Sequence, residues 1–239
     1  MSQFIRSELL LGENSTHILQ TKRVAIFGVG GVGGYVAEAL GRSGVGALDL
    51  FDNDTVSITN INRQIVALHS TVGRLKVDVM KERLLDINPD IKVSTYPVFY
   101  LPETADEIDL SVYDYIVDCI DTVSAKIDLV VRADALGVPI ICAMGAGNKL
   151  NPMGFEVADI YKTSVCPLAR VMRRELKARG IKKCKVVYSR EEARTPLALD
   201  RVDKQEGRRS TPGSLPFVPS AAGLLLASEV VYDLIKEVK

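Results

Sequence analysis

The sequence of 239 residues lacks closely spaced cysteine pairs. Its cysteines are Cys119, Cys142, Cys166 and Cys184, and none belongs to a C-x-x-C pattern. Structural zinc sites usually bring their cysteines in such pairs, so we expect no zinc. The residues after Met1 also lack the apolar core of a secretory signal. Isolated cysteines without a signal sequence predict a cytoplasmic protein with free thiols.

Net charge and long apolar runs are lacking as well. Thirty Lys and Arg residues balance thirty Asp and Glu residues, so no overall field attracts nucleic acid or anionic lipid. Any basic binding surface must therefore be local. The apolar run at 221–227 is far shorter than the roughly 20 residues that span a membrane, and we expect no membrane association. Histidine occurs only at His17 and His69, without a paired ligand or carboxylate that would indicate catalysis.

Segments typical of strands and helices alternate along the first 150 residues. This order predicts an α/β fold of the Rossmann type, in which helices cover both faces of a mostly parallel sheet. The expected strands lie at 23–27, 47–51, 91–96, 115–119 and 138–142, and the expected helices at 31–42, 76–87 and 123–136.

The pattern changes after residue 150. An alternating segment at 155–160 predicts an antiparallel strand, and a basic amphipathic helix at 167–179 and a strand at 185–188 follow it. Residues 190–213 are polar and rich in turn formers, which indicates a mobile loop. A closing helix is expected at 221–238. We interpret residues 1–150 as a nucleotide-binding core and 151–239 as a smaller C-terminal extension of the same domain.

A glycine-rich turn follows the first expected strand. Gly28, Gly30 and Gly33 have the G-x-G-x-x-G spacing, and Gly31 lies between them. In this motif the first glycine permits a tight turn and the second lets the backbone approach a phosphate, while the helix N-terminus attracts the anion. Asp52 follows the next strand, where a carboxylate binds ribose hydroxyls. By themselves the glycines suggest a dinucleotide.

Polar residues beyond the glycines indicate a nucleoside triphosphate instead. Asn60, Arg63, Gln64 and Lys76 follow the acidic cluster that ends at Asp54. Arg63 can bind two phosphate oxygens at once, and Lys76 adds a point charge at a helix start. A dehydrogenase does not need them, although each alone is typical of a solvated surface. Together they predict a triphosphate that is cleaved at its α-phosphate.

A carboxylate follows the expected strand at 115–119. Asp121 lies just past this strand, and the carboxyl ends of parallel strands face the ligand crevice. We expect Asp121 to bind a magnesium ion that bridges the phosphates. Asp118 is still within the strand, where a structural carboxylate is an equal alternative.

These motifs together resemble the ubiquitin-activating-type (HesA/MoeB/ThiF) adenylyltransferase superfamily over about residues 4–150. The resemblance implies ATP-dependent adenylation of a carboxylate, with Arg63, Lys76 and Asp121 as catalytic residues. It also implies a homodimer, because Arg6 is similar to an N-terminal arginine that reaches into the neighbouring subunit's nucleotide site. The matching stretches are 28–33, 52–56, 60–64, 71–76 and 119–121.

The second half resembles one branch of this superfamily, the bacterial tRNA threonylcarbamoyladenosine dehydratases. The similarity lies in 166–170, 187–191 and 213–223. It implies ATP-dependent cyclisation of a threonylcarbamoyl group on the adenosine beside the anticodon of a tRNA. Sulfur-relay partner proteins and a monovalent cation near 145–148 stay open. A local basic cluster at residues 170–185 also suits RNA phosphates. Its expected tRNA-binding residues are Arg173, Arg174, Lys177 and Lys182.

Two other functions remain as alternatives. In the first, the chain adenylates the C-terminus of a ubiquitin-like sulfur-carrier protein, although enzymes of that kind carry two C-x-x-C zinc pairs. In the second, it is the NAD-binding oxidoreductase that the glycines alone suggest. Cys166 precedes a helix and is a less favoured candidate for a thioester nucleophile. The basic helix, taken alone, is also typical of a solvated face.

Overall fold

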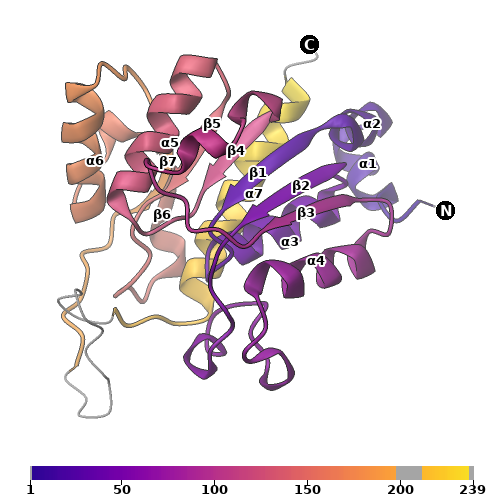
Figure 1. Ribbon diagram of the computed structural model, residues 1–239, viewed down its shortest axis with the longest axis horizontal. Helices are drawn as coiled ribbons and strands as arrows, with labels where there is room; N and C mark the ends of the chain where they lie inside the picture. Colours follow the sequence, from indigo (N-terminus) through magenta and orange to yellow (C-terminus); the bar gives the residue numbers. More distant parts are fainter. Residues whose placement is uncertain (1, 198–211, 237–239) are drawn as a thin grey trace.

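Seven strands form one sheet at the centre of the computed structural model, which describes residues 2–197 and 212–236 (Figure 1). The strand order is β3-β2-β1-β4-β5-β7-β6, and every neighbouring pair is parallel except β6 and β7. This confirms the predicted parallel sheet with an antiparallel C-terminal pair. The strands are β1 Arg23–Phe27, β2 Ala47–Phe51, β3 Lys92–Tyr96, β4 Tyr115–Asp118, β5 Ile140–Ala143, β6 Phe155–Asp159 and β7 Lys185–Ser189.

Helices connect the strands within the described residues. The predicted helices at 76–87 and 123–136 have the expected bounds, because Asn88-Pro89 and Gly137 end them. The α-helices are α1 Ile5–Leu11, α2 Glu13–Thr21, α3 Gly33–Ser43, α4 Lys76–Ile87, α5 Val123–Leu136, α6 Pro167–Ala178 and α7 Phe217–Lys236. The 3₁₀ turns are η1 Ile58–Asn60, η2 His69–Thr71, η3 Ala105–Glu107, η4 Leu110–Val112, η5 Pro152–Gly154 and η6 Ile160–Lys162.

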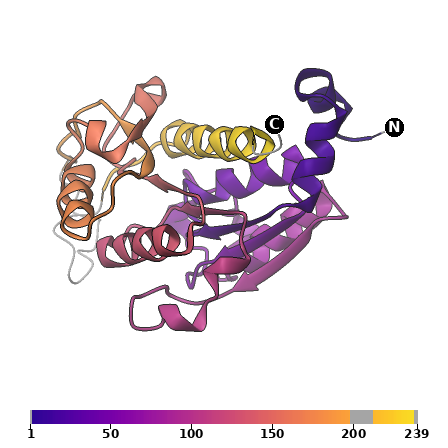
Figure 2. The same ribbon diagram turned by 90° about the horizontal axis from the view of Figure 1, so that it is seen from above.

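Helical layers cover both faces of the sheet, as predicted (Figure 2). α3, α4 and α7 pack on one face, and α5, α6 and the segment 97–113 cover the other. Successive strand residues point to opposite faces, so Ile26 joins the first layer and Phe27 the second. Burial on both faces explains why the central strands β1 and β4 are largely apolar in the sequence, whereas the outer strands β3 and β6 are only partly buried and more polar.

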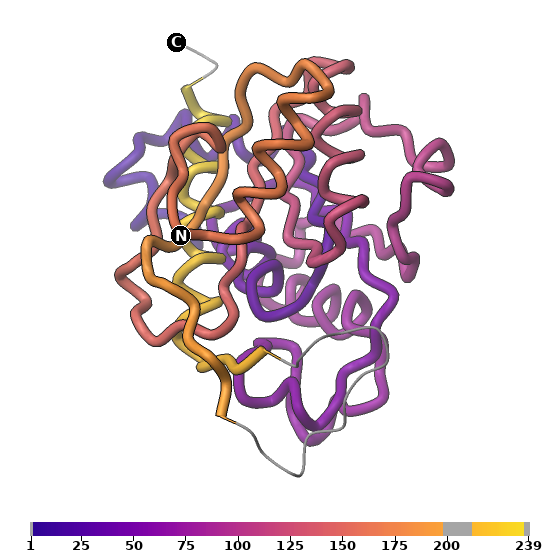
Figure 3. Tube along the Cα trace, turned by 90° about the vertical axis from the view of Figure 1, so that its left-hand side faces the viewer, coloured from indigo at the N-terminus to yellow at the C-terminus, as the bar shows by residue number. Residues whose placement is uncertain are grey.

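α7 differs from the predicted closing helix. It begins at Phe217 rather than at residue 221, and Pro219 lies in its first turn. Proline is tolerated there because the first N–H groups of a helix have no helical acceptor. The expectation that Pro219 precedes the helix was therefore wrong. α7 is long and apolar enough to span a membrane, but half of it is buried, and it contacts β4 to β7 and α2 as a core helix does (Figure 3).

Two helices that were not predicted, α1 and α2, precede β1. Leu19 of α2 is buried in the main core. Phe4, at the start of α1, packs on Gly44, which ends α3 in a left-handed conformation. These contacts fix the N-terminal helices at the end of the sheet where the parallel strands begin (Figure 1). The predicted mobile loop falls largely on residues 198–211, which lie outside the described residues.

Candidate nucleotide site

The glycine loop joins β1 to α3 at the carboxyl end of the sheet. Gly28 has a positive φ of 90°, and a Cβ on it would lie 2.8 Å from the Cys119 carbonyl oxygen. A Cβ on Gly33 would lie 1.8 Å from the Gly28 carbonyl oxygen. Both positions therefore require glycine for the fold itself.

Gly30 is different, because the space beside it is open. The nearest heavy atom to a Cβ at this position is Gln64 Nε2, at 3.8 Å. The protein thus does not explain why glycine stands there, whereas close approach of a ligand does. α3 begins at Gly33 without a side-chain cap. Its first N–H groups and its positive dipole end face this loop, which is an arrangement that attracts a phosphate.

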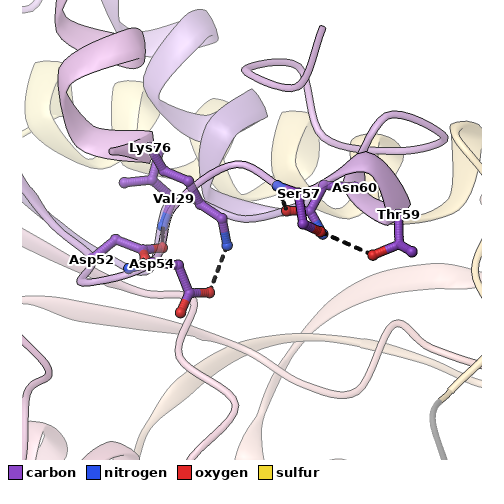
Figure 4. A network of polar contacts seen from close by, with 7 residues as sticks. All are labelled: Val29, Asp52, Asp54, Ser57, Thr59, Asn60 and Lys76. Atoms are coloured by element: carbon purple, nitrogen blue, oxygen red, sulfur yellow. Dashed lines mark hydrogen bonds and ion pairs between the residues drawn. The ribbon is translucent and has the colours of Figure 1, made fainter. Parts of the chain in front are cut away.

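Asp52 supports the glycine loop by accepting hydrogen bonds from backbone N–H groups. Its Oδ2 accepts a hydrogen bond from the Val29 N–H at 2.7 Å, and its Oδ1 accepts one from the Asp54 N–H at 2.8 Å (Figure 4). Burial raises the pKa of Asp52, against the attraction of the Lys76 charge. Asp54 is exposed and pairs with Lys76 Nζ at 2.6 Å, while the Lys76 side chain is only 5% exposed. The Lys76 side chain is therefore not solvated, although a lysine taken alone is typical of a solvated surface.

The motif around η1 places two amides beside the loop. Asn60 Oδ1 accepts a hydrogen bond from the Ser57 N–H at 3.1 Å, so this side chain also holds its own turn together (Figure 4). Gln64 is 7% exposed, and its Oε1 has no hydrogen-bond partner among the described residues. An unpaired buried acceptor is costly. Gln64 Nε2, at the other end of the same amide, is the heavy atom nearest to a Cβ on Gly30, so this amide borders the open space of the loop.

Arg63 is the cation best placed for a phosphate. Its Cγ lies 3.6 Å from where a Cβ on Gly31 would stand. The guanidinium donates to the Thr59 carbonyl and to Asn62 Oδ1, both at 2.9 Å, and no described carboxylate pairs with it. Burial lowers the pKa of Arg63, since no anion compensates its charge. An anionic ligand would supply that compensation.

Asp121 follows β4 at the same edge of the sheet and is exposed. Among the described residues, no group of three or more His, Cys, Asp or Glu side chains could hold a metal. Magnesium usually takes one or two carboxylates and completes its shell with phosphate oxygens and water. A single carboxylate therefore fits an ion that arrives with the nucleotide, and not a preformed metal centre.

Asp118 has the structural role that the sequence offered as an alternative to a role in ligand binding. Its carboxylate lies 2.7 Å from Lys126 Nζ, and both side chains are fully buried. Burial has the largest single effect and disfavours the Lys126 ammonium, but the charge and hydrogen bond of Asp118, together with the neighbouring Cys142 and Cys119, outweigh it and raise the pKa of Lys126. Lys126 was not predicted from the sequence. No local sequence pattern predicts such a partner, because the pairing depends on how α5 packs beside β4.

Arg6 lies far from the glycine loop of its own chain. It is exposed on α1, and the neighbouring Phe4 packs at the C-terminal end of α3, whereas the glycine loop precedes the N-terminal end. The 11 residues of α3 separate these ends by roughly 16 Å. The predicted role of Arg6 in a nucleotide site therefore requires a second subunit.

The basic cluster lies on and after α6, at the end of the molecule opposite α1 (Figures 1 and 2). Arg173 is half-buried and donates to the Thr163 carbonyl at 2.9 Å. Arg174 pairs with Glu175 at 2.7 Å. Lys177 and Lys182 are exposed, as is the neighbouring Lys183, so a phosphate can reach these lysines.

Comparisons with known proteins assign the chain to a family. The model of the ThiF family matches residues 4–237. The chain belongs to the ThiF family. A Bacillus subtilis protein named tRNA threonylcarbamoyladenosine dehydratase is 43% identical over 247 residues. The aligned region covers 100% of the present chain and 97% of that protein.

Solved structures extend this similarity to three dimensions. The Escherichia coli tRNA N6-threonylcarbamoyladenosine dehydratase matches with TM-scores of 0.88 for its complex with AMP and 0.87 for its complex with ATP. Both matches have 31% identity and cover 99% of this ThiF-family chain and 95% of that chain. A Candida glabrata adenylyltransferase and sulfurtransferase, UBA4, is 35% identical over 55% of this chain and 30% of that protein. Similarity to the dehydratases thus includes the C-terminal half.

Proposed function

We propose that this chain is an ATP-dependent tRNA threonylcarbamoyladenosine dehydratase that acts through a carboxyl-adenylate. The observation that carries the proposal is the full-length similarity to the Bacillus subtilis dehydratase, together with the match to the Escherichia coli enzyme in complex with ATP. The open space at Gly30, the Gln64 amide that borders it, and an Arg63 guanidinium without a carboxylate partner among the described residues support a nucleotide at this site.

In the first step, the threonyl carboxylate attacks the α-phosphate of ATP, and pyrophosphate leaves. The loop from Gly28 to Gly33 holds phosphates on backbone N–H groups, and Asp52 and Gln64 bind the nucleoside. Arg63 and Lys76 stabilise the negative charge that grows on the phosphate oxygens in the transition state. A magnesium ion held by Asp121 would neutralise phosphate charge there. Because these groups are in place before the substrate binds, little reorganisation opposes the reaction.

In the second step, the carbamoyl group of the same nucleoside attacks the acyl-adenylate, and AMP leaves. A five-membered ring closes, and the net change is the loss of one water. Both reacting groups belong to one substrate, so proximity replaces an enzyme nucleophile. The cysteines agree with this. Cys166 is 3% exposed, and burial raises the pKa of Cys119, which disfavours a thiolate.

We further propose a homodimer in which Arg6 enters the partner's nucleotide site. An apolar groove of about 460 Å³ runs between α1, α3 and α7 and is lined in part by Leu10; Leu10 and the preceding Leu9 are 87% and 78% exposed. Exposed leucines next to a groove favour contact with another protein surface. A second copy of the chain would cover them and bring Arg6 near a glycine loop.

The tRNA would contact the basic cluster, with the exposed Lys177 and Lys182 among its phosphate ligands. Arg173 and Arg174 complete the predicted set: Arg173 keeps its charge because its partner Thr163 is neutral, and Arg174 would exchange its contact with Glu175 for a phosphate. We propose a cytoplasmic location, because the four free cysteines suit a reducing compartment.

Mass spectrometry of tRNA nucleosides after incubation with ATP tests the proposal. Wild-type protein should convert threonylcarbamoyladenosine to its cyclic form, and Arg63→Met protein should not. Arg132→Met is the matched control, since Arg132 pairs with Asp106 and Asp128 on the other side of the sheet. Failure of the wild type to cyclise tRNA, with ATP–pyrophosphate exchange that depends on a sulfur-carrier protein, would establish the rival function instead.

A further inference from the structure

A buried ion pair lies directly behind the loop that carries Asp121. Asp118 is the last residue of β4, and Lys126 lies in the second turn of α5. Their side chains are both 0% exposed and lie 2.7 Å apart. The adenylation steps described above give neither residue a part, so the pair needs its own explanation.

Both members of the pair bind the backbone of one residue, Ile120. Asp118 Oδ1 accepts a hydrogen bond from the Ile120 N–H at 3.1 Å, and Lys126 Nζ donates to the Ile120 carbonyl at 3.1 Å. The preceding Cys119 N–H donates to the Phe27 carbonyl at 2.8 Å. The turn between β4 and α5 is therefore held at its two peptide groups immediately before Asp121.

The same turn also supports the glycine loop. Gly28 lies so close that a Cβ would stand 2.8 Å from the Cys119 carbonyl oxygen and 3.3 Å from the Ile120 nitrogen. A shift of the turn would therefore move the floor of the phosphate cradle together with Asp121. The clamp thus connects the two parts of the site that must face the same phosphates.

Stability alone is a weak reason for such a pair. Replacement of a buried ion pair by apolar residues of similar volume is often neutral or stabilising, because the charges lose their hydration. Fixed geometry is a stronger reason, since ligands that hold a metal depend on groups behind them for orientation. The location of the pair, one residue from the peptide that presents Asp121, agrees with this reason.

We propose that Asp118 and Lys126 are positioning residues, which clamp the backbone of Ile120 so that Asp121 and the glycine loop face the metal-bound phosphates of ATP together. The inference rests on the proposed function for the identity of the nucleotide. It adds two residues that never touch the substrate and act through the backbone of Ile120.

Nucleotide binding with and without magnesium tests the clamp. Lys126→Met removes the charge and keeps most of the volume, and Lys126→Arg restores the charge. Asp49→Asn is the matched control, because Asp49 is a 1% exposed carboxylate on β2 that pairs with Arg23 away from the glycine loop. Calorimetry measures the Kd of a non-hydrolysable ATP analogue in EDTA and in magnesium, and thermal unfolding measures stability separately.

We expect Lys126→Met to bind the analogue in EDTA within a few-fold of wild type but to lose about 10-fold or more of the tightening that magnesium gives, as when groups behind a metal ligand are lost. Its kcat for ATP–pyrophosphate exchange should fall about 100-fold, a typical cost of a 1 Å misplacement. Lys126→Arg should recover part of both. Asp49→Asn should lower stability and leave the magnesium effect intact.

A folded Lys126→Met protein with the wild-type magnesium effect would overturn the proposal. If Lys126→Met does not fold, the double variant Asp118→Asn/Lys126→Met takes its place in the same assay, because it also removes the uncompensated charge of Asp118. A normal magnesium effect in the double variant would also overturn the clamp. Failure of the proposed function is distinct, since it appears as a wild-type protein that binds magnesium–ATP but does not cyclise tRNA.

Discussion

Gly30→Ala should separate the fold of this protein from its ability to bind ATP. A methyl group at this position meets no protein atom closer than Gln64 Nε2 at 3.8 Å, and Gly30 does not have the left-handed backbone that favours glycine. At such positions the change from glycine to alanine restricts the unfolded chain and raises the free energy of unfolding by about 0.4–1 kcal/mol. We therefore expect the ligand-free variant to melt at or slightly above the wild-type temperature.

The same methyl group should damage nucleotide binding. It fills the open space that a phosphate must enter to reach the backbone N–H groups of the loop. A displaced phosphate loses at least one charge-assisted hydrogen bond, which is worth about 1.5–3 kcal/mol, so the Kd for ATP should rise about 10- to 100-fold. The stability change and the binding change thus have opposite signs.

Two other glycines serve as controls. Gly33→Ala should prevent folding, because its Cβ would lie 1.8 Å from the Gly28 carbonyl oxygen. Gly145→Ala should change neither property, since its nearest neighbour is Cys166 Sγ at 3.9 Å. Thermal unfolding and calorimetric titration with ATP measure the two quantities. Unchanged ATP affinity in a folded Gly30→Ala protein would refute the phosphate cradle, and a large loss of stability would refute the open space.

Other predictions concern the dimer, the RNA surface and α7. Arg6→Ala and Lys76→Met proteins should each lack activity, but their mixture should regain about a quarter of it if subunits pair at random and hybrid dimers carry one intact site; no recovery after subunit exchange would contradict an Arg6 that acts in the partner's site. Lys177→Glu with Lys182→Glu should weaken tRNA binding and lower its salt dependence by about two counterions, measured by filter binding, with ATP affinity as the unchanged control. Gly223→Ala should destabilise the protein in chemical unfolding, because its Cβ would lie 2.5 Å from the Val32 carbonyl oxygen; wild-type stability would show that α3 and α7 can move apart freely.

The parallel sheet and the glycine loop were predictable from the sequence. Strands buried on both faces are short apolar runs, and each is bounded by turn residues that show where it ends. Glycine spacing after the first run has a physical cause at Gly28 and Gly33, where a side chain would collide with the backbone. The bounds of α4 and α5 could also be predicted, since local residues end both helices.

Features that depend on distant packing were not predictable. Lys126 is one lysine in an ordinary helix, and only the position of α5 beside β4 shows that it is buried against Asp118. α1 and α2 are short, and Phe4 is buried because it meets Gly44 from another element. The neutralisation of Arg174 by Glu175 was hidden for a different reason, because a count of charges does not tell which of them pair.

The packing of α7 on α3 also has a consequence for synthesis of the chain. More than 170 residues separate the end of α3 from the start of α7, which a ribosome adds in about 10–30 s at typical rates. Throughout that time, the apolar face that α7 later covers has no partner, and Pro219 is not yet beside Gly31. A nascent chain therefore completes its ATP site only after residues 217–236 emerge, so nucleotide binding becomes a sign that translation of this segment is finished.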